Sequence, residues 1–209
     1  MPNLVTLANA RSALNKMDIP DVNTALDHAL GVVSSLLASK LGIPTFSSVT
    51  QTDLFMVIVA HVNLHDGVPL KMKLSRMFLD EGEDLTISWA ARVTDTFEAQ
   101  TTTEHTLNDV KGYLSLYNPQ IVTGVLKVEY TAGFNAIADG STQVYENVPD
   151  WLRSVALITL TAIFDILRFT NTDQEGQATK RSSPAVPPTA MELLAPYLRT
   201  LQDCLNPTE

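Results

Sequence analysis

Two short stretches of the sequence decide the fold: Val128-Glu129-Tyr130-Thr131-Ala132-Gly133-Phe134 and Val148-Pro149-Asp150-Trp151-Leu152. Apolar residues on one face of a strand lead into the first stretch: Val122, Leu126, Val128 and Tyr130. Gly133 permits a tight exit from this strand, and Pro149 suits the first turn of a helix. The two stretches therefore predict a β segment that is fixed against the helix after it.

The helix that opens at Pro149 is predicted to be central, because apolar residues cover most of its circumference. Its most apolar run, residues 154–164, has 11 residues, whereas a bilayer-spanning helix needs about 20. The N-terminus, residues 1–11, lacks the basic and long apolar regions of a secretory signal. We therefore expect a buried helix in a soluble protein without a membrane segment.

Two amphipathic helices are predicted upstream. Thr6 is a plausible N-cap for the first, whose apolar residues follow at helical spacing. Pro20 opens the second, whose apolar residues keep the helical period for five turns until Gly42 and Pro44 stop it. A short joint between the two helices predicts a helical hairpin.

Between these helices and the central helix, the period is that of strands. Residues 54–62 are almost wholly apolar, Asp66-Gly67 is a turn signal, and residues 70–75 alternate, which together predict a hairpin. Residues 85–89 alternate again. Residues 91–109 are polar and are interpreted as an exposed strand or a long loop.

The C-terminal part is predicted to be a polar linker or extended arm, followed by a short helix. Thr189 and Glu192 fit a capping box at the start of that helix, and Pro196 predicts a kink or restart within it.

The order of elements predicts an α+β fold: a small helical bundle with a large antiparallel β insert. The bundle has two N-terminal helices, a central apolar helix and a short C-terminal helix. The expected divisions are a helical core at 1–46 and 149–170, a β-rich insert at 47–148, a linker at 171–188, and a C-terminal helix and tail at 189–209.

The chain is acidic, with 14 Lys and Arg against 23 Asp and Glu among 209 residues, for a net charge of -9. Residues 47–148 carry 6 basic and 13 acidic groups, so most of the excess lies in the β insert. Phosphate polyanions are repelled by such a chain, which argues against a nucleic-acid-binding protein with a broad basic surface. Hydrophobic residues make up 45% of the chain, which supports a real core and excludes general disorder.

Metal and cofactor sites are not favoured. His61 and His65 share a strand face beside Asp66, but no third and fourth ligand is evident, and an exposed turn is the simpler interpretation. The acidic run at 80–84 lacks the twelve-residue calcium loop pattern. Cys204 is the only cysteine, so neither an intrachain disulfide nor a cysteine-based zinc site is available. We expect no cofactor.

Motifs of catalysis are also missing. The sequence has no Gly-x-Ser-x-Gly elbow, no phosphate loop and no Gly-x-Gly-x-x-Gly, and nothing selects one carboxylate pair among 23 acids. We therefore expect a protein that is not an enzyme.

Three motifs, in order along the chain, resemble the head-tail connector (adaptor) family of tailed bacteriophages. The first is Leu4-Val5-Thr6-Leu7-Ala8-x-Ala10-Arg11, with Asp21 and the long second helix after it. The second is the strand-to-helix junction, which includes Val128, Tyr130, Gly133, Phe134, Pro149 and Trp151. The third is Leu193-Leu194-Ala195-Pro196-Tyr197. The stretch between Ser47 and Gln120 is longer than the family leads us to expect.

The resemblance implies a structural protein of the virion neck, made in the host cytoplasm and assembled as a ring of about twelve copies. The ring would lie beneath the portal protein of the DNA-filled head, receive the next neck or tail protein, and leave a channel for double-stranded DNA. The C-terminal segment would dock on the portal through Leu193, Leu194, Tyr197, Leu198, Leu201, Leu205 and Glu209. An acidic channel or rim, which passes DNA by repelling its phosphates, would include Asp80, Glu81, Glu83 and Asp84.

Three alternatives stay open at this point. One is another neck component, such as a stopper or tail-completion protein. The second is a small cytoplasmic acidic α+β enzyme, and the third is a ligand-binding or interaction module.

Overall fold

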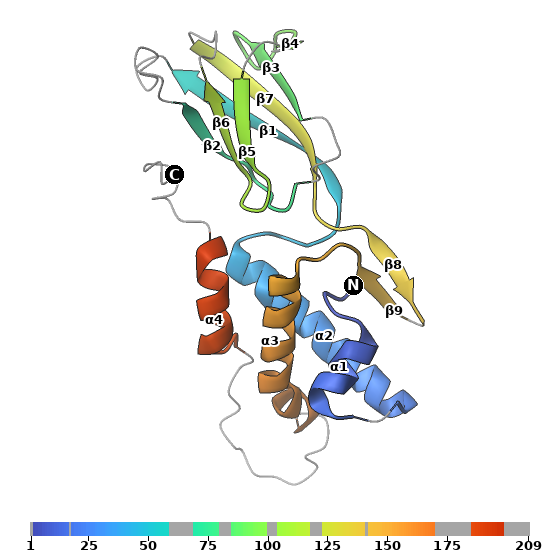
Figure 1. The fold of residues 1–209 in the computed structure, drawn as a ribbon. Helices are drawn as coiled ribbons and strands as arrows, with labels where there is room; N and C mark the ends of the chain where they lie inside the picture. Colours follow the sequence, from blue (N-terminus) through green and yellow to red (C-terminus); the bar gives the residue numbers. More distant parts are fainter. Residues whose placement is uncertain are drawn as a thin grey trace, which may run out of the picture. The chain divides into compact units, whose positions relative to one another are not determined.

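The computed structural model describes residues 2–16, 18–58, 69–79, 85–99, 104–117, 123–140, 142–169 and 185–198. The chain divides into two compact units (Figure 1). The helical unit comprises Met1–Ser47 and Phe134–Leu198, and the β unit comprises Ser48–Gly133. Helices and antiparallel sheets together confirm the predicted α+β fold.

The second helix begins and ends at the predicted residues, whereas the first begins after Thr6 as predicted but ends at Leu14, before the predicted Met17. Helix α1 (Leu7–Leu14) follows Thr6, whose hydroxyl accepts a 3.2 Å hydrogen bond from the Asn9 N–H. Helix α2 (Pro20–Leu41) has proline in its first turn and ends at Gly42, which has a φ of 69°. Glycine reaches this left-handed conformation without steric cost.

Helix α3 (Asp150–Phe169) is the centre of the helical unit, because it contacts α1, α2 and α4 (Pro188–Leu194). Its fully buried residues recur at helical spacing: Leu152, Val155, Ala156, Thr159 and Leu160. The prediction of a central helix is confirmed.

The predicted capping box at the start of α4 is wrong. The helix begins at Pro188 after Pro187, which makes no side-chain cap, so Thr189 lies inside the first turn. The break predicted at Pro196 is confirmed, since Ala195–Tyr197 form a single 3₁₀ turn (η2).

A hairpin of two short strands, β8 (Ala136–Asp139) and β9 (Thr142–Tyr145), also belongs to the helical unit. The sequence interpretation had grouped these residues with the β insert. The N-terminal segment joins them, because Asn3 donates to the Gln143 carbonyl and accepts from the Tyr145 N–H, both at 2.9 Å. The hairpin therefore anchors the start of the chain.

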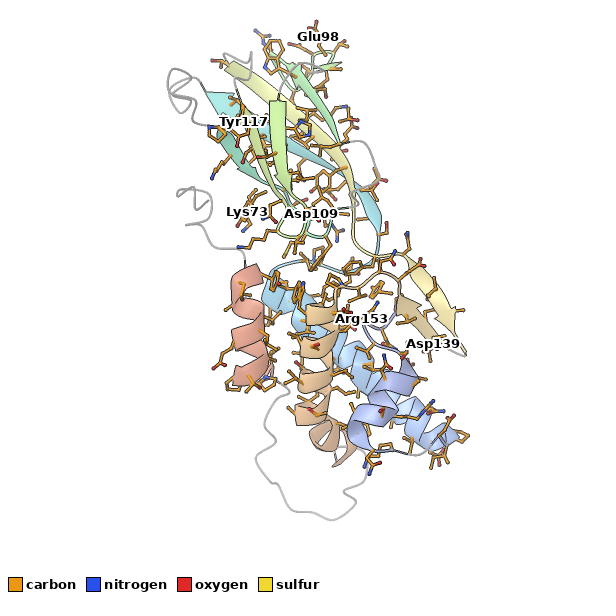
Figure 2. The ribbon with its side chains drawn as sticks, viewed as in Figure 1. Lys73, Glu98, Asp109, Tyr117, Asp139 and Arg153 are labelled. Carbon is orange, nitrogen blue, oxygen red and sulfur yellow. The ribbon has the colours of Figure 1, made fainter. Side chains whose placement is uncertain are left out.

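Two sheets form the β unit. The first has the order β1-β7-β3-β4, and the second has the order β2-β6-β5. The strands are β1 (Val49–Ile58), β2 (Leu70–Lys73), β3 (Thr86–Ala90), β4 (Glu98–Ala99), β5 (Glu104–Asn108), β6 (Tyr113–Tyr117) and β7 (Thr123–Ala132). One core, which includes Leu74, Leu114, Leu116, Leu126 and Val128, joins residues of both sheets. The side chains of Lys73 on β2, Tyr117 on β6 and Glu98 on β4 are labelled in Figure 2.

The predicted hairpin between residues 54–62 and 70–75 is wrong. Strand β1 pairs with β7, and β2 pairs with β6 in the other sheet. The turn signal at Asp66-Gly67 lies outside the described residues. The interpretation of 91–109 as an exposed strand is partly confirmed, since β4 and most of β5 are exposed.

Two glycines give a matched test of this backbone. Gly133 has a φ of 107°, so Gly133→Ala should lower the free energy of unfolding by about 1–3 kcal/mol. A Cβ at Gly31, inside α2, would meet nothing within 4 Å, so Gly31→Ala should raise it by about 0.5–1 kcal/mol. Urea unfolding of the two variants checks both signs. A neutral Gly133→Ala would contradict the conformational requirement.

Candidate functional site

A buried polar cluster lies at the heart of the β unit. The Asp53 carboxylate on β1 accepts hydrogen bonds from the Ser75 N–H at 2.6 Å, the Ser75 hydroxyl at 2.7 Å and the Tyr130 hydroxyl at 2.7 Å. Asp53 is only 9% exposed. A buried carboxylate is stable when its oxygens are hydrogen-bonded in this way. The Asp53 cluster therefore ties the segment after β2 to the β1–β7 pair.

Tyr130, one of the junction residues of the sequence motif, completes this cluster. Its hydroxyl donates to Asp53 and accepts from the Arg76 N–H at 3.2 Å. Burial, with the Asp53 charge adding to it, raises the pKa of Tyr130 from 10.0 to about 12. The neutral phenol is thus the form that the fold requires. Ser75 and Arg76 lie 55 and 54 residues from Tyr130 in the sequence, so no local pattern identified them.

Of the other junction residues, Val128 is buried in the core of the β unit, Trp151 lies in α3, and Phe134 lies where the chain re-enters the helical unit. Phe46, Phe134 and Tyr145 pack as three rings with centroids 6.2–6.3 Å apart. The Phe134 N–H donates to the Phe46 carbonyl at 2.7 Å, and the Tyr145 hydroxyl lies 2.9 Å from the Ser47 hydroxyl. We call these residues the aromatic junction. It holds the two crossing points of the chain together.

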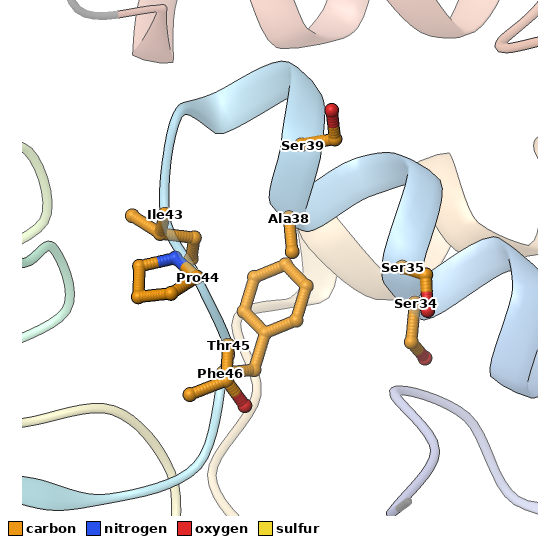
Figure 3. A pocket seen from close by; sticks show the side chains of 8 residues that line it. All are labelled: Ser34, Ser35, Ala38, Ser39, Ile43, Pro44, Thr45 and Phe46. Atoms are coloured by element: carbon orange, nitrogen blue, oxygen red, sulfur yellow. The ribbon is translucent and has the colours of Figure 1, made fainter.

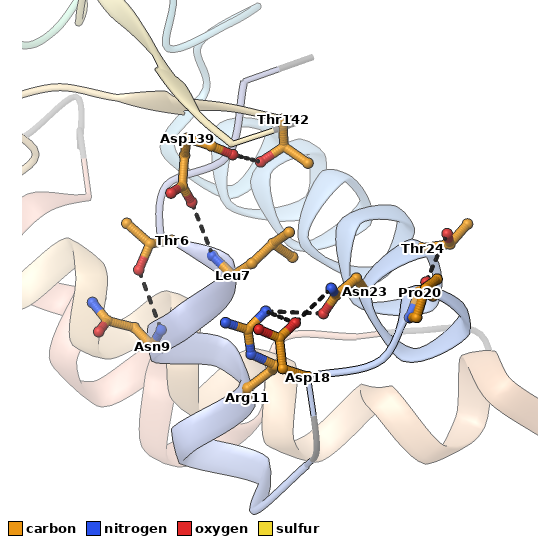
Figure 4. Close-up of polar contacts among 10 residues, drawn as sticks. All are labelled: Thr6, Leu7, Asn9, Arg11, Asp18, Pro20, Asn23, Thr24, Asp139 and Thr142. Atoms are coloured by element: carbon orange, nitrogen blue, oxygen red, sulfur yellow. Dashed lines mark hydrogen bonds and ion pairs between the residues drawn. The ribbon is translucent and has the colours of Figure 1, made fainter.

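The N-terminal motif is also structural (Figure 4). Leu4 and Val5 are buried, and the Leu7 N–H donates to the Asp139 carboxylate at 3.2 Å. The Arg11 guanidinium donates to Asn23 on α2 at 2.9 Å and lies 3.1 Å from Asp18. This motif therefore fixes α1 against β8 and α2.

The C-terminal motif packs on α3. The Tyr197 ring stacks on Trp151 with centroids 3.6 Å apart and planes 2° apart. Ala190 and Leu194 are fully buried, whereas Leu193 is 46% exposed. Among the described residues predicted to dock on a portal, Leu194 is thus unavailable while α4 stays packed, and Tyr197 and Leu198 are half-buried.

Several predicted site residues lie outside the described residues. They are Leu201, Leu205 and Glu209 of the docking set and Asp80, Glu81, Glu83 and Asp84 of the acidic set. The sequence-based questions about His61, His65 and Cys204 concern residues outside the described ranges as well.

A cavity of about 270 Å³ lies beside the C-terminal half of α2 (Figure 3). Its lining is Ser34, Ser35, Ala38, Ser39, Ile43, Pro44, Thr45 and Phe46. This lining offers hydroxyl and apolar groups without an acid, a base or a metal ligand. Within the described ranges, no group of three metal-ligating side chains occurs and no helix is long and apolar enough to cross a membrane.

A feature that the sequence analysis missed is the exposed face of β1. The run at 54–62 is almost wholly apolar in sequence, yet within it Leu54 is 52% and Met56 83% exposed. Asp53, Phe55 and Val57 alternate with them and turn toward the core. Asp53 is the signal in the sequence. Because side chains alternate between the two faces of a strand, the face that Asp53 shares with Phe55 and Val57 differs from the face of Leu54 and Met56.

Among the comparisons with known proteins, the one with solved structures finds similar chains. No protein-family model and no curated protein match the sequence. The chain is similar over 96% of its length to 97% of a chain in a solved structure described as the neck of native GTA particle computed with C12 symmetry. The TM-score is 0.41 and the sequence identity 14%. At these values the likeness does not establish a common fold.

The Asp53 cluster predicts a specific pH dependence. The folded state favours the neutral Tyr130, so this contribution is present below pH 10 and is lost as the pH rises through about 12. Two pKa units correspond to about 3 kcal/mol. Tyr130→Phe should cost about 1–3 kcal/mol at neutral pH and should remove this part of the alkaline loss.

Unfolding in denaturant at several pH values between 8 and 12 measures the effect. Tyr117→Phe on β6 is the control, because Tyr117 is half-buried and lies outside the Asp53 cluster. An alkaline loss that is equal in Tyr130→Phe and the wild type would rule out the role of Tyr130.

Proposed function

We propose that the protein is a structural head-tail connector (adaptor) of a tailed bacteriophage. It would form a ring, of about twelve copies, in the virion neck beneath the portal protein, and would receive the next neck or tail protein on its other side. It is not an enzyme in this account. The three sequence motifs resemble the connector family, and the contacts of the motif residues in the fold support the proposal.

The observation that carries the proposal is the convergence of the motifs. The N-terminal motif contacts β8 through the hydrogen bond from the Leu7 N–H to the Asp139 carboxylate, and its Thr6 caps α1. In the second motif, Phe134 packs in the aromatic junction and Trp151 stacks on Tyr197 of the third. Motifs that lie more than 180 residues apart in the sequence therefore support one helical unit. The resemblance is thus one of fold determinants and not of scattered surface residues.

The packing of α4 determines which of the proposed docking residues are exposed. Leu193 is the exposed apolar side chain of α4, whereas Leu194 and Ala190 face the helical unit. Docking of the folded α4 on a portal would therefore use Leu193 and the half-buried Leu198, together with the tail residues Leu201, Leu205 and Glu209. Docking through Leu194 would require α4 to leave α3.

The passage of DNA is the remaining part of the proposal. Double-stranded DNA would move through the channel without specific binding, because acidic side chains repel its phosphates. Asp80, Glu81, Glu83 and Asp84 are the proposed lining or rim residues. A structure of the assembly that places all four on the outer wall would exclude this role.

Co-assembly with the cognate portal protein tests the function. We expect a ring complex many times the mass of the 22.8 kDa chain, measured by light scattering after size-exclusion chromatography. The control is a mixture of the portal protein with an unrelated acidic protein of similar size. A chain that remains separate from the portal at all concentrations would contradict the proposal.

Two C-terminal variants, one in α4 and one in η2, separate docking from packing. Leu193→Asp should weaken portal binding at least tenfold with little change in unfolding, because the side chain is exposed. Tyr197→Ala should lower stability by about 1–3 kcal/mol, because it removes the stack on Trp151. Portal binding by light scattering and thermal unfolding measure the two effects. Full portal affinity in Leu193→Asp would exclude this face of α4 as the docking surface.

A further inference from the structure

A shallow hollow of about 480 Å³ lies on the outer side of α2. The described residues that line it are His28, Gly31, Val32, Ser35 and Leu36. The core residues Leu30, Val33 and Leu37 are at most 1% exposed and, at helical spacing, lie on the opposite side of α2. The hollow is therefore a feature of the surface of the helical unit.

This hollow continues into the cavity beside the C-terminal half of α2, because Ser35 lines both. The cavity extends past the end of the helix to Pro44 and Phe46 (Figure 3). We call the two hollows together the α2 groove. From His28 to the end of α2 the groove is about 20 Å long, at 1.5 Å per residue. Its described lining has no aspartate, glutamate, lysine or arginine, so an occupant with apolar side chains suits it.

The described part of the C-terminus stops at the same end of the helical unit as α2. Phe46, five residues after α2, packs on Tyr145, which lies five residues before α3. Tyr197 stacks on Trp151 in the first turn of α3. The end of α2, the start of α3 and the last described residue, Leu198, thus lie at one end of this unit (Figure 1).

The tail, residues 199–209, starts at that end and is long enough to follow the groove. Its eleven residues reach up to about 36 Å when extended, against the groove length of about 20 Å. Leu198, Leu201 and Leu205 recur at the spacing of one face of a helix. An amphipathic segment with such a face is the usual occupant of an apolar groove.

We propose that the tail docks in the α2 groove of its own subunit, with Leu201 and Leu205 against Val32 and Leu36. A tail joined to the same subunit has an effective concentration on the order of millimolar, which favours it over the tail of a second copy.

Leu201 and Leu205 are also proposed contacts of the portal protein. A docked tail therefore withholds them from the portal, and docking on the portal requires the tail to leave the groove. This release step rests on the proposed function, whereas the docked state does not.

The native thiol of Cys204, between Leu201 and Leu205, provides a probe of the docked state. Mild oxidation of full-length Ser35→Cys, without portal, should join the introduced thiol to Cys204, because docking brings their Cα atoms within about 7 Å. The matched control is Ala162→Cys, which is exposed on α3 outside the groove lining. Non-reducing electrophoresis and mass spectrometry should show at least tenfold slower disulfide formation in the control. Equal rates in the two variants, or disulfides only between two copies, would overturn the inference.

Tail variants test whether the leucines hold the tail in place. In the Ser35→Cys background, Leu201→Asp combined with Leu205→Asp should slow the intrachain disulfide at least tenfold. Asn206→Asp also adds a charge but lies off the leucine face, so it should leave the rate unchanged. Circular dichroism confirms that each variant folds. A rate that does not respond to the leucine changes would contradict docking through this face.

Portal binding tests the release step. Ser35→Cys protein locked by its disulfide should bind the cognate portal at least tenfold more weakly than the same protein after reduction, measured by light scattering. Equal binding by the locked and reduced forms would overturn the release step. A reduced protein that does not bind the portal would instead overturn the proposed function, while the disulfide rates still decide the docked state.

Discussion

The hydrogen bond from the Phe134 N–H to the Phe46 carbonyl, 2.7 Å long, joins the two places where the chain crosses between its units. Phe46 ends the segment that follows α2, and Phe134 begins the segment that leads to β8 and α3. A single hydrogen bond contributes only about 1 kcal/mol, so the packing of Phe46, Phe134 and Tyr145 around it matters as much. Because this junction is closed, the β unit can be inserted without interrupting the helical unit.

Inside the β unit, separate segments of the chain are likewise held together, here by the hydrogen bonds of the Asp53 cluster. Asp53, Ser75 and Tyr130 come from three separate segments, and their hydrogen bonds leave no carboxylate oxygen without a donor. With its polar groups satisfied inside, β1 has only apolar and hydroxyl side chains for its outer face. The interior requirement thus leaves Leu54 and Met56 on an outer face without charge.

Helices were predictable from the sequence because their signals are local. Thr6, Pro20 and Gly42 mark the ends of α1 and α2 within a few residues of the periodic run that they cap. Strand partners were not predictable, because β1 and β7 are more than 60 residues apart and the Asp66-Gly67 signal favoured a local hairpin instead. Strands β6, β8 and β9 were missed because they are short, although Leu114 and Leu116 alternate and Asp139-Gly140 is a turn signal. The Asp53 cluster and the exposed pair Leu54 and Met56 depend on that nonlocal pairing, so the sequence could not reveal them.

Most of the net negative charge of the chain falls in residues 47–148. In the proposed ring, acidic side chains repel the phosphates of the passing DNA, while α4 contacts the portal. Cryo-electron microscopy of the particle neck tests the central claim most directly. The account predicts a closed ring of this chain between the portal and the tail. A neck that lacks this chain, or that holds it as a single copy, would contradict it.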